Sequence, residues 1–174
     1  MVMTVGLIIA KKDSQRLINK NWRDYNGKPM FQWNLEKCLR IFDKVYVSSD
    51  YNLILDISKE LGAIPIKRPP ELLDTPNIPV YQHAMKQMKD VDIIVAVQVN
   101  SPDIDEKLIN DVKYLMEYGF YEIMTCHQNR KIYGSIWALN TKLLKKYPMN
   151  RYYFPQPELL LVDKSKDIHF KEDL

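Results

Sequence analysis

Cationic and hydrogen-bonding side chains gather directly after the first apolar run of the chain, at residues 5–10. Among them, in order along the chain, are Lys11, Ser14, Arg16, Lys20 and Asn21. Ammonium groups and a planar guanidinium bind phosphate oxygens, and hydroxyl and amide groups add neutral donors. This mixture suits a triphosphate. On charge alone, a solvated basic loop is the preferred interpretation, and a triphosphate site remains the alternative.

Two further polar residues follow apolar runs. Asp50 comes after residues 45–49, and Gln98 ends the run at residues 92–98. Ligands of open parallel sheets bind outside the carboxyl ends of the strands, so both positions are candidates for a ligand contact. Asp50 fits the N-cap of a following helix equally well. For His83 and His127, ordinary packing is the preferred interpretation.

Several kinds of site have no support in the sequence. The chain has only five glycines, which form neither a dinucleotide-binding GxGxxG nor a P-loop. It contains no HExxH or GxSxG motif. The two cysteines, Cys38 and Cys126, lie far apart in apolar surroundings and are expected to be buried thiols. Redox chemistry with a dinucleotide, P-loop hydrolysis and a zinc site of Cys/His spacing are therefore disfavoured.

The elements that must position these residues alternate between strand and helix. Strands are expected at residues 5–10, 45–49, 64–66, 92–98, 123–126 and 135–139. Helices are expected at residues 29–42, 53–61 and 79–88, from Asp103 or Asp105 to Gly119, and at residues 141–147. The pattern predicts a single α/β domain over residues 1–174, with a mostly parallel sheet flanked by helices.

Motifs in a fixed order extend beyond the basic loop. They are Gly27-Lys28-Pro29, Phe42-Asp43-Lys44-Val45-Tyr46-Val47-Ser48-Ser49-Asp50, Arg68-Pro69-Pro70-Glu71-Leu72 with Asp74-Thr75, Gln98 with Ser101-Pro102, and Tyr133-Gly134-Ser135-Ile136-Trp137. Together with the loop, which resembles the signature A-R-x-x-S-K-x-L-x-x-K-N, they cover about two thirds of the chain. The sequence thereby resembles the acylneuraminate cytidylyltransferases, which include the CMP-sialic acid synthetases.

This resemblance implies a Rossmann-like nucleotide-diphospho-sugar transferase fold. It also implies transfer of CMP from CTP to a keto-sugar acid, with a divalent cation, Mg²⁺ or Mn²⁺, and release of pyrophosphate. Lys11, Arg16 and Lys20 would bind the phosphates, with Arg16 and Lys20 as the catalytic pair. Ser14, Asn21 and Asp50 would contact the nucleotide. Gln98, Ser101 and Lys131 would contact the acceptor.

The chain departs from the family pattern in three places. Where the family has a metal-binding D-I-D, the chain has Asp167 and His169, an altered metal pair. Aspartates at positions 103 and 105 replace the arginine that usually follows S-P, and residues 127–133 are short where a long insertion is usual. The acceptor half is thus less well preserved than the nucleotide half. Transfer to a sugar phosphate, or nucleotide binding without turnover, remains an alternative.

Composition sets expectations for partners and compartment. The net charge is +3 and is spread along the chain, which disfavours nucleic acid as a partner. The apolar start of the chain has the character of a strand, and no run approaches the length of a membrane span. A cytoplasmic protein is therefore expected. The resemblance implies a homodimer, and Tyr152, Tyr153 and Phe154 offer an apolar patch for it.

Overall fold

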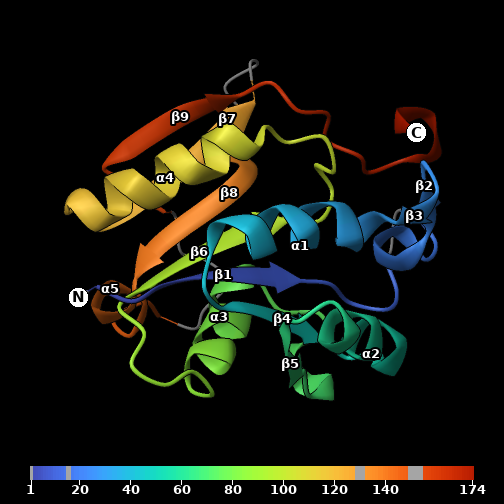
Figure 1. Cartoon of the computed structure of the whole chain (residues 1–174), viewed down its shortest axis with the longest axis horizontal. Coiled ribbons are helices and arrows are strands. Elements are labelled where there is room, and N and C mark those ends of the chain that lie inside the picture. Colours follow the sequence, from blue (N-terminus) through green and yellow to red (C-terminus); the bar gives the residue numbers. More distant parts are fainter. Residues whose placement is uncertain (1, 15–16, 128–131, 149–154) are drawn as a thin grey trace.

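A seven-stranded sheet runs through the middle of the computed structural model, which describes residues 2–14, 17–127, 132–148 and 155–174, without the side chains of residues 132 and 133. In chain order its strands are β1 (Thr4–Ile9), β4 (Val45–Ser49), β5 (Ile64–Lys67), β6 (Ile93–Gln98), β7 (Glu122–His127), β8 (Ile132–Asn140) and β9 (Leu159–Asp163). They lie in the order β5-β4-β1-β6-β8-β7-β9 (Figure 1). Strand β8 is antiparallel to both of its neighbours, and the other pairs are parallel. The predicted mostly parallel sheet is confirmed.

Helices cover both faces of this sheet. They are α1 (Met30–Ile41), α2 (Asn52–Glu60), α3 (Asn77–Met85), α4 (Glu106–Tyr118) and α5 (Thr141–Leu144). Apolar residues of α1, α2 and α4 share one core cluster with the sheet, and those of α3 and α5 share the other. Short 3₁₀ helices occur at Lys20–Trp22, Pro70–Leu72 and Lys171–Asp173, and a small hairpin is formed by β2 (Asp24–Tyr25) and β3 (Lys28–Pro29). The layers are visible in Figure 1.

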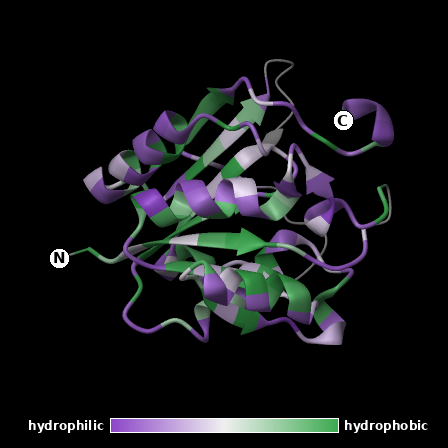
Figure 2. Ribbon diagram, turned by 45° about the vertical axis from the view of Figure 1, so that its right-hand side comes forward, coloured by the Kyte–Doolittle hydropathy of each residue, from purple (hydrophilic) through white to green (hydrophobic). Residues whose placement is uncertain are grey.

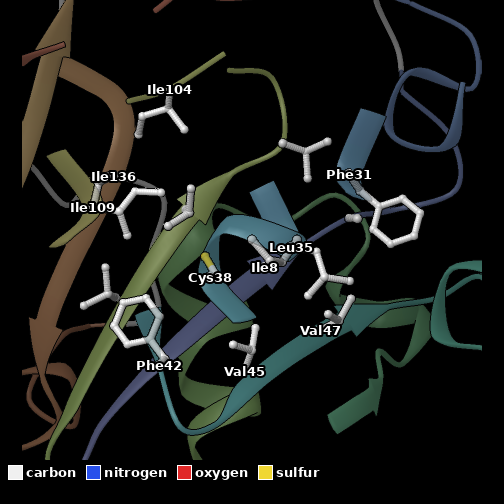
Figure 3. Packing of buried hydrophobic residues seen from close by; sticks show 14 of the residues in the cluster. Ile8, Phe31, Leu35, Cys38, Phe42, Val45, Val47, Ile104, Ile109 and Ile136 are labelled. Carbon is white, nitrogen blue, oxygen red and sulfur yellow. The ribbon is translucent and has the colours of Figure 1, made fainter. Parts of the chain in front are cut away.

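The sequence pattern explains why α1 packs where it does. Phe31, Leu35 and Cys38 recur at helical spacing and are fully buried against β1 and β4 (Figure 3). Pro29 occupies the N-cap, one residue before the helix begins. Figure 2 shows the same logic across the molecule, because the strands are mostly hydrophobic and the helices combine both characters. In the described part of the chain, no helix is long and apolar enough to cross a bilayer.

Four predicted boundaries were wrong by two or three residues, and one of them is the start of β8, which lies at Ile132 and not at residue 135. Helix α3 begins at Asn77, not at Pro79, because a proline in the first turn lacks only an N–H that would have no partner within the helix. It ends at Met85 and not at residue 88. Helix α5 stops at Leu144, although the sequence pattern extends to Tyr147.

The N-cap of α4 is settled between two candidates. The Asp105 carboxylate accepts a hydrogen bond from the Lys107 backbone N–H at 2.9 Å, which is the N-cap geometry. Asp103 is instead bonded to the backbone N–H of Lys166, at 3.1 Å. The two aspartates therefore have different structural roles.

Gly134 permits the close approach of β7 and β8. A Cβ atom at this position would lie 2.7 Å from the carbonyl carbon of Thr125 and would also meet its hydroxyl oxygen. The Thr125 hydroxyl accepts a hydrogen bond from the Ile136 backbone N–H at 2.9 Å. The register shifts between Met124 and Cys126, so this pair of strands is irregular at the point where glycine is needed.

Candidate functional site

A cavity of about 400 Å³ opens at the carboxyl ends of β1 and β6. Six of the residues predicted for the site line it: Lys11, Ser14, Lys20, Asn21, Gln98 and His169. Polar residues that the sequence analysis did not assign to the site also line it: Arg68, Thr75, Asn77 and Asn100. Its position matches the general rule for ligand sites in open α/β sheets.

The basic loop is held in shape by its own side chains. Asn21 is buried, and its amide donates to the Lys11 carbonyl at 2.7 Å. The Trp22 indole N–H donates to the Lys12 carbonyl at 3.2 Å. Lys11 itself reaches across to the Leu73 carbonyl, at 3.2 Å. These contacts bring the two ends of the loop together, so that both of its described lysines at the cavity, at positions 11 and 20, lie at one wall.

Another predicted nucleotide residue, Asp50, stands apart from this wall. Asp50 is not among the described residues that line the cavity. Its carboxylate accepts from the Lys12 backbone N–H at 2.9 Å and so anchors the start of the loop. It is not the N-cap of α2 either, because Tyr51 occupies that position. Arg16 lies outside the described residues.

Arg68 is a buried cation in the cavity wall. Only 5% of the residue is exposed, and its guanidinium donates to the Ser48 carbonyl at 2.8 Å and to the Ser48 hydroxyl at 3.3 Å. Burial lowers its pKa to about 10, and nearby Asp50 opposes that shift, so the side chain remains charged at neutral pH. Among the described residues it forms no ion pair. A buried charge needs a counter-charge or several hydrogen bonds, and an anionic ligand supplies both.

Sequence reasoning noticed Arg68 only as part of a motif. The available signal was an arginine placed directly after a strand and before Pro69 and Pro70, where the chain must turn at the carboxyl end of β5. That signal does not show that its side chain reaches Ser48 in the neighbouring strand β4.

The predicted acceptor residues fare differently from one another. Gln98 lines the cavity, and its amide nitrogen donates to the Tyr81 hydroxyl at 2.9 Å. Tyr81 is fully buried, and burial raises the pKa of its phenol. Ser101 is also fully buried and is not among the described lining residues, so a direct acceptor contact is not what its position supports. Neither the polar character of serine nor its position beside Pro102 in the motif indicates that the side chain is buried. Lys131 lies outside the described residues.

Asp167 and His169 lie together, as their spacing predicts. The His169 Nε2 and Asp167 Oδ1 atoms are 2.9 Å apart. The Asn100 amide also donates to Asp167 Oδ1, and His127 Nε2 lies 3.6 Å from Asp167 Oδ2. His169 reaches the cavity wall, and its backbone N–H donates to Asp173 at 2.8 Å. Sequence reasoning did not link Asn100 or His127 to this pair.

The chemistry of this pair fits a divalent cation. A carboxylate oxygen and an imidazole nitrogen are ligand types that divalent transition cations accept, and in this structure the two atoms are paired with each other at 2.9 Å. Within the described residues, no group of three or more His, Cys, Asp or Glu side chains is placed to hold a metal ion. A cation here would therefore depend on oxygens of a bound ligand as well as on these two side chains.

Sequence comparison places most of the chain in one family. Residues 5–155 match the model of a family described as cytidylyltransferase. A pseudaminic acid cytidylyltransferase of Campylobacter jejuni is 26% identical over 150 residues, which are 73% of this chain and 65% of that protein. A 3-deoxy-manno-octulosonate cytidylyltransferase of Saccharophagus degradans is 34% identical over 110 residues, 62% of this chain and 43% of that protein.

A further relative shows how little of some proteins the chain represents. A Helicobacter pylori protein named as a pseudaminic acid cytidylyltransferase and a UDP-2,4-diacetamido-2,4,6-trideoxy-beta-L-altropyranose hydrolase is 29% identical over 59% of this chain. That alignment covers 21% of the relative. The chain thus spans from about a fifth to two thirds of the relatives described here.

Solved structures share the fold at low identity. A CMP:2-keto-3-deoxy-manno-octonic acid synthetase complexed with CTP has a TM-score of 0.78 and 15% identity, covering 98% of this chain and 94% of that one. A 4-diphosphocytidyl-2C-methyl-D-erythritol synthase of Anaerococcus prevotii has a TM-score of 0.74 and 11% identity, covering 99% of this chain and 94% of that one. They confirm the nucleotidyltransferase fold. On the match over residues 5–155, the chain belongs to the cytidylyltransferase family.

Proposed function

We propose that the chain transfers CMP from CTP to a keto-sugar acid of the sialic-acid kind and releases pyrophosphate. The observation that carries this proposal is the convergence of Lys11, Lys20 and buried Arg68 on one cavity at the carboxyl ends of the strands. Three cations and several neutral donors in one cavity suit a triphosphate better than a neutral ligand. The names of the relatives, which specify sugar acids, support the acceptor class.

In the proposed reaction, a hydroxyl oxygen of the acceptor attacks the α-phosphorus of CTP. The bond from that phosphorus to the bridging oxygen breaks, pyrophosphate leaves with the electron pair, and the hydroxyl proton passes to solvent. The protein's task is to position the two substrates and to stabilise charge on the phosphate oxygens. Lys11, Lys20 and Arg16 would serve this purpose, with Lys20 and Arg16 closest to the reacting phosphate.

The remaining side chains of the cavity would bind and orient the substrates. Ser14 and Asn21 would contact the nucleotide, and Asp50 would act through the loop that it anchors. Gln98, whose amide nitrogen is engaged by Tyr81, would present its carbonyl oxygen to a hydroxyl of the acceptor. Lys131 is proposed on the motif alone.

Asp167 and His169 would hold a divalent cation, Mg²⁺ or Mn²⁺, together with phosphate oxygens. When bound, such an ion offsets the charge of the triphosphate and polarises its phosphorus–oxygen bonds. The Asn100 amide donates to Asp167 Oδ1 and so fixes the orientation of the carboxylate. A fold neighbour is a manganese complex, Rv0371C of Mycobacterium tuberculosis H37Rv, with a TM-score of 0.73 and 9% identity over 99% of this chain and 96% of that one.

The proposal is tested by thermal shift with CTP, GTP, UTP and ATP, each with Mg²⁺ and with Mn²⁺. A ligand present at about 100 times its dissociation constant adds roughly 2.7 kcal/mol to stability, so binding is easily detected. We expect CTP to give the largest shift, and pyrophosphate release when a keto-sugar acid is added. Release with a sugar phosphate instead would reassign the acceptor. A CTP shift without release from any acceptor would indicate a nucleotide-binding protein without turnover, and no shift with any nucleotide would refute the site.

A homodimer also remains our proposal, because the resemblance implies one. The tyrosine and phenylalanine patch at residues 152–154 lies outside the described residues, so the structure adds nothing to it. Light scattering at high protein concentration tests it directly, and a monomeric mass would reject it.

A further inference from the structure

Two side chains of α1 bind four backbone carbonyl groups, one at the last residue of β6 and three in the loop that follows it. Asn34 donates to the Gln98 carbonyl at 2.7 Å and to the Ser101 carbonyl at 2.8 Å. Lys37 donates to the Pro102 carbonyl at 2.6 Å and to the Ile104 carbonyl at 2.9 Å. The loop therefore owes its position to a helix more than sixty residues earlier in the chain.

Both donors are polar groups placed where the helix is otherwise apolar. Asn34 is fully buried beside Leu35, and the two hydrogens of its amide satisfy two carbonyls. Lys37 is half-buried, and burial lowers its pKa while Asp103 and Glu106 oppose that shift. Burying these polar groups costs free energy because they lose contact with water. The hydrogen bonds to the carbonyl groups offset that cost.

The other side of the same loop holds the segment that carries Asp167 and His169. The Asn100 carbonyl accepts from the Ile168 backbone N–H at 2.8 Å. The Asp103 carboxylate accepts from the Lys166 backbone N–H at 3.1 Å. Ile168 is fully buried in the core cluster that includes α1, so this segment packs against the same body. The loop thus lies between α1 and the proposed cation pair.

Two parts of the cavity wall depend on the position of this loop. Gln98, the last residue of β6, and Asn100, in the loop after it, both line the cavity. His169 lines it from the segment bonded to the loop. A shift of the loop would therefore move an acceptor residue and the metal pair at the same time.

We propose that Asn34 and Lys37 are positioning residues, which fix the loop after β6 and, through it, the Asp167–His169 segment at the cavity. Their effect on turnover rests on the proposed function, but their effect on the loop does not. Both side chains donate to backbone carbonyls, and neither is among the described residues that line the cavity. They therefore act on the geometry of the site and not on its chemistry.

The test compares Lys37→Met with Arg40→Met by amide hydrogen exchange. Methionine keeps the apolar stem of Lys37 and removes its donors. Arg40 lies one turn further along α1, is exposed and pairs with Glu106, so its variant removes the same charge without touching the loop. In Lys37→Met we expect at least tenfold faster exchange at the amides of Ile104 and Ile168, with strand β1 unchanged. In Arg40→Met all of these should exchange as in the wild type.

Activity supplies a second readout. Lys37→Met should lower kcat more than it raises the KM for CTP, because Lys11, Lys20 and Arg68 keep their positions. Lys37→Arg, which keeps a charged donor, should recover part of kcat and of the exchange protection. Equal protection in Lys37→Met and the wild type would overturn the proposal, as would faster exchange spread evenly over every strand.

A wild-type measurement covers the case in which the variants do not fold. In protein labelled uniformly with ¹⁵N and ¹³C, the Lys37 ammonium should show couplings across hydrogen bonds to the carbonyl carbons of Pro102 and Ile104, and their absence would overturn the proposal. If the exchange results hold and wild-type protein binds no nucleotide, the proposed function fails and the positioning inference stands.

Discussion

Two cations of the cavity predict how a substitution in its wall will change the affinity for CTP. Lys20 and Arg68 each offer a charged donor to the cavity. The Ser48 carbonyl that accepts from Arg68 also accepts from the Ala10 backbone N–H at 3.0 Å, so it keeps a partner when Arg68 is replaced. Lys20→Ala and Arg68→Met should each weaken CTP binding by about 1.5–3 kcal/mol, the usual worth of a charged hydrogen bond.

Calorimetry measures this affinity, and thermal unfolding shows whether either variant loses stability. We expect only a small loss, of about 1 kcal/mol, for Arg68→Met. Lys59→Ala is the matched control, because Lys59 is exposed at the end of α2. Unchanged CTP affinity in both cavity variants would remove this wall from the site.

His169 gives the second prediction for a single residue. An imidazole beside the Asp167 carboxylate favours Mn²⁺ or another transition metal over Mg²⁺, which prefers oxygen ligands. Wild-type protein should therefore bind CTP more tightly with Mn²⁺ than with Mg²⁺, and His169→Asp should reverse that order. Thermal shift with each ion measures it. If both proteins respond equally to the two ions, residue 169 does not contact the cation.

At the scale of elements, the β7–β8 pair depends on Gly134. A methyl group there would meet backbone atoms of Thr125, which cannot yield as a flexible side chain can. Gly134→Ala should lower the free energy of unfolding by about 1–3 kcal/mol, the usual cost of overpacking. Chemical denaturation measures this. Ser135→Ala is the control, since the Ser135 hydroxyl is buried and has no hydrogen-bond partner among the described residues. A stability loss no larger than that of the control would contradict the prediction.

The elements that sequence predicted well are those with local causes. Strands β1, β4 and β6 are continuous apolar runs, and α1 has a regular apolar face, so their type follows from periodicity. The direction of β8 does not follow, because antiparallel pairing with β6 and β7 depends on residues distant in sequence. For the same reason the N-cap of α4 was open between Asp103 and Asp105, until the contact with Lys166 separated them.

The candidate site was predictable where one segment carries it. The basic loop follows β1, and Gln98 is the last residue of β6. The carboxyl ends of parallel strands lie at the same edge of a sheet, where ligands bind. Arg68 and Asn100 were missed because tertiary contacts position them at the site. Arg68 contacts Ser48, and Asn100 contacts Asp167. Ser101 shows the converse: its motif placed it in the site, but the loop turns its side chain into the core.

The stability of the whole molecule should depend on pH through the titration of His83. Burial lowers its pKa, as do Arg68 and Lys86, while Glu71 opposes the shift. The unfolded chain therefore binds a proton at a higher pH than the folded protein does. Below the unfolded pKa of about 6.5, stability should fall as the pH is lowered through the folded pKa.

Denaturation at pH 7.5, 6.5 and 5.5 measures this slope. His83→Gln should reduce it, because glutamine does not titrate in this range. The value at pH 7.5 should change little, since His83 is neutral there in both states. An identical slope in the wild type and in His83→Gln would assign the acid sensitivity to other groups.

The position of β9 at the edge of the sheet has a consequence for handling the protein. Among the described residues no strand pairs with its outer side, and Leu160 and Val162 are exposed on it. Such an edge offers unpaired backbone groups and apolar side chains to another chain, which favours aggregation. Exposed charges at Glu158 and Lys164 flank the strand and oppose this joining. Conditions that screen those charges, such as high salt, are therefore the ones under which precipitation should begin.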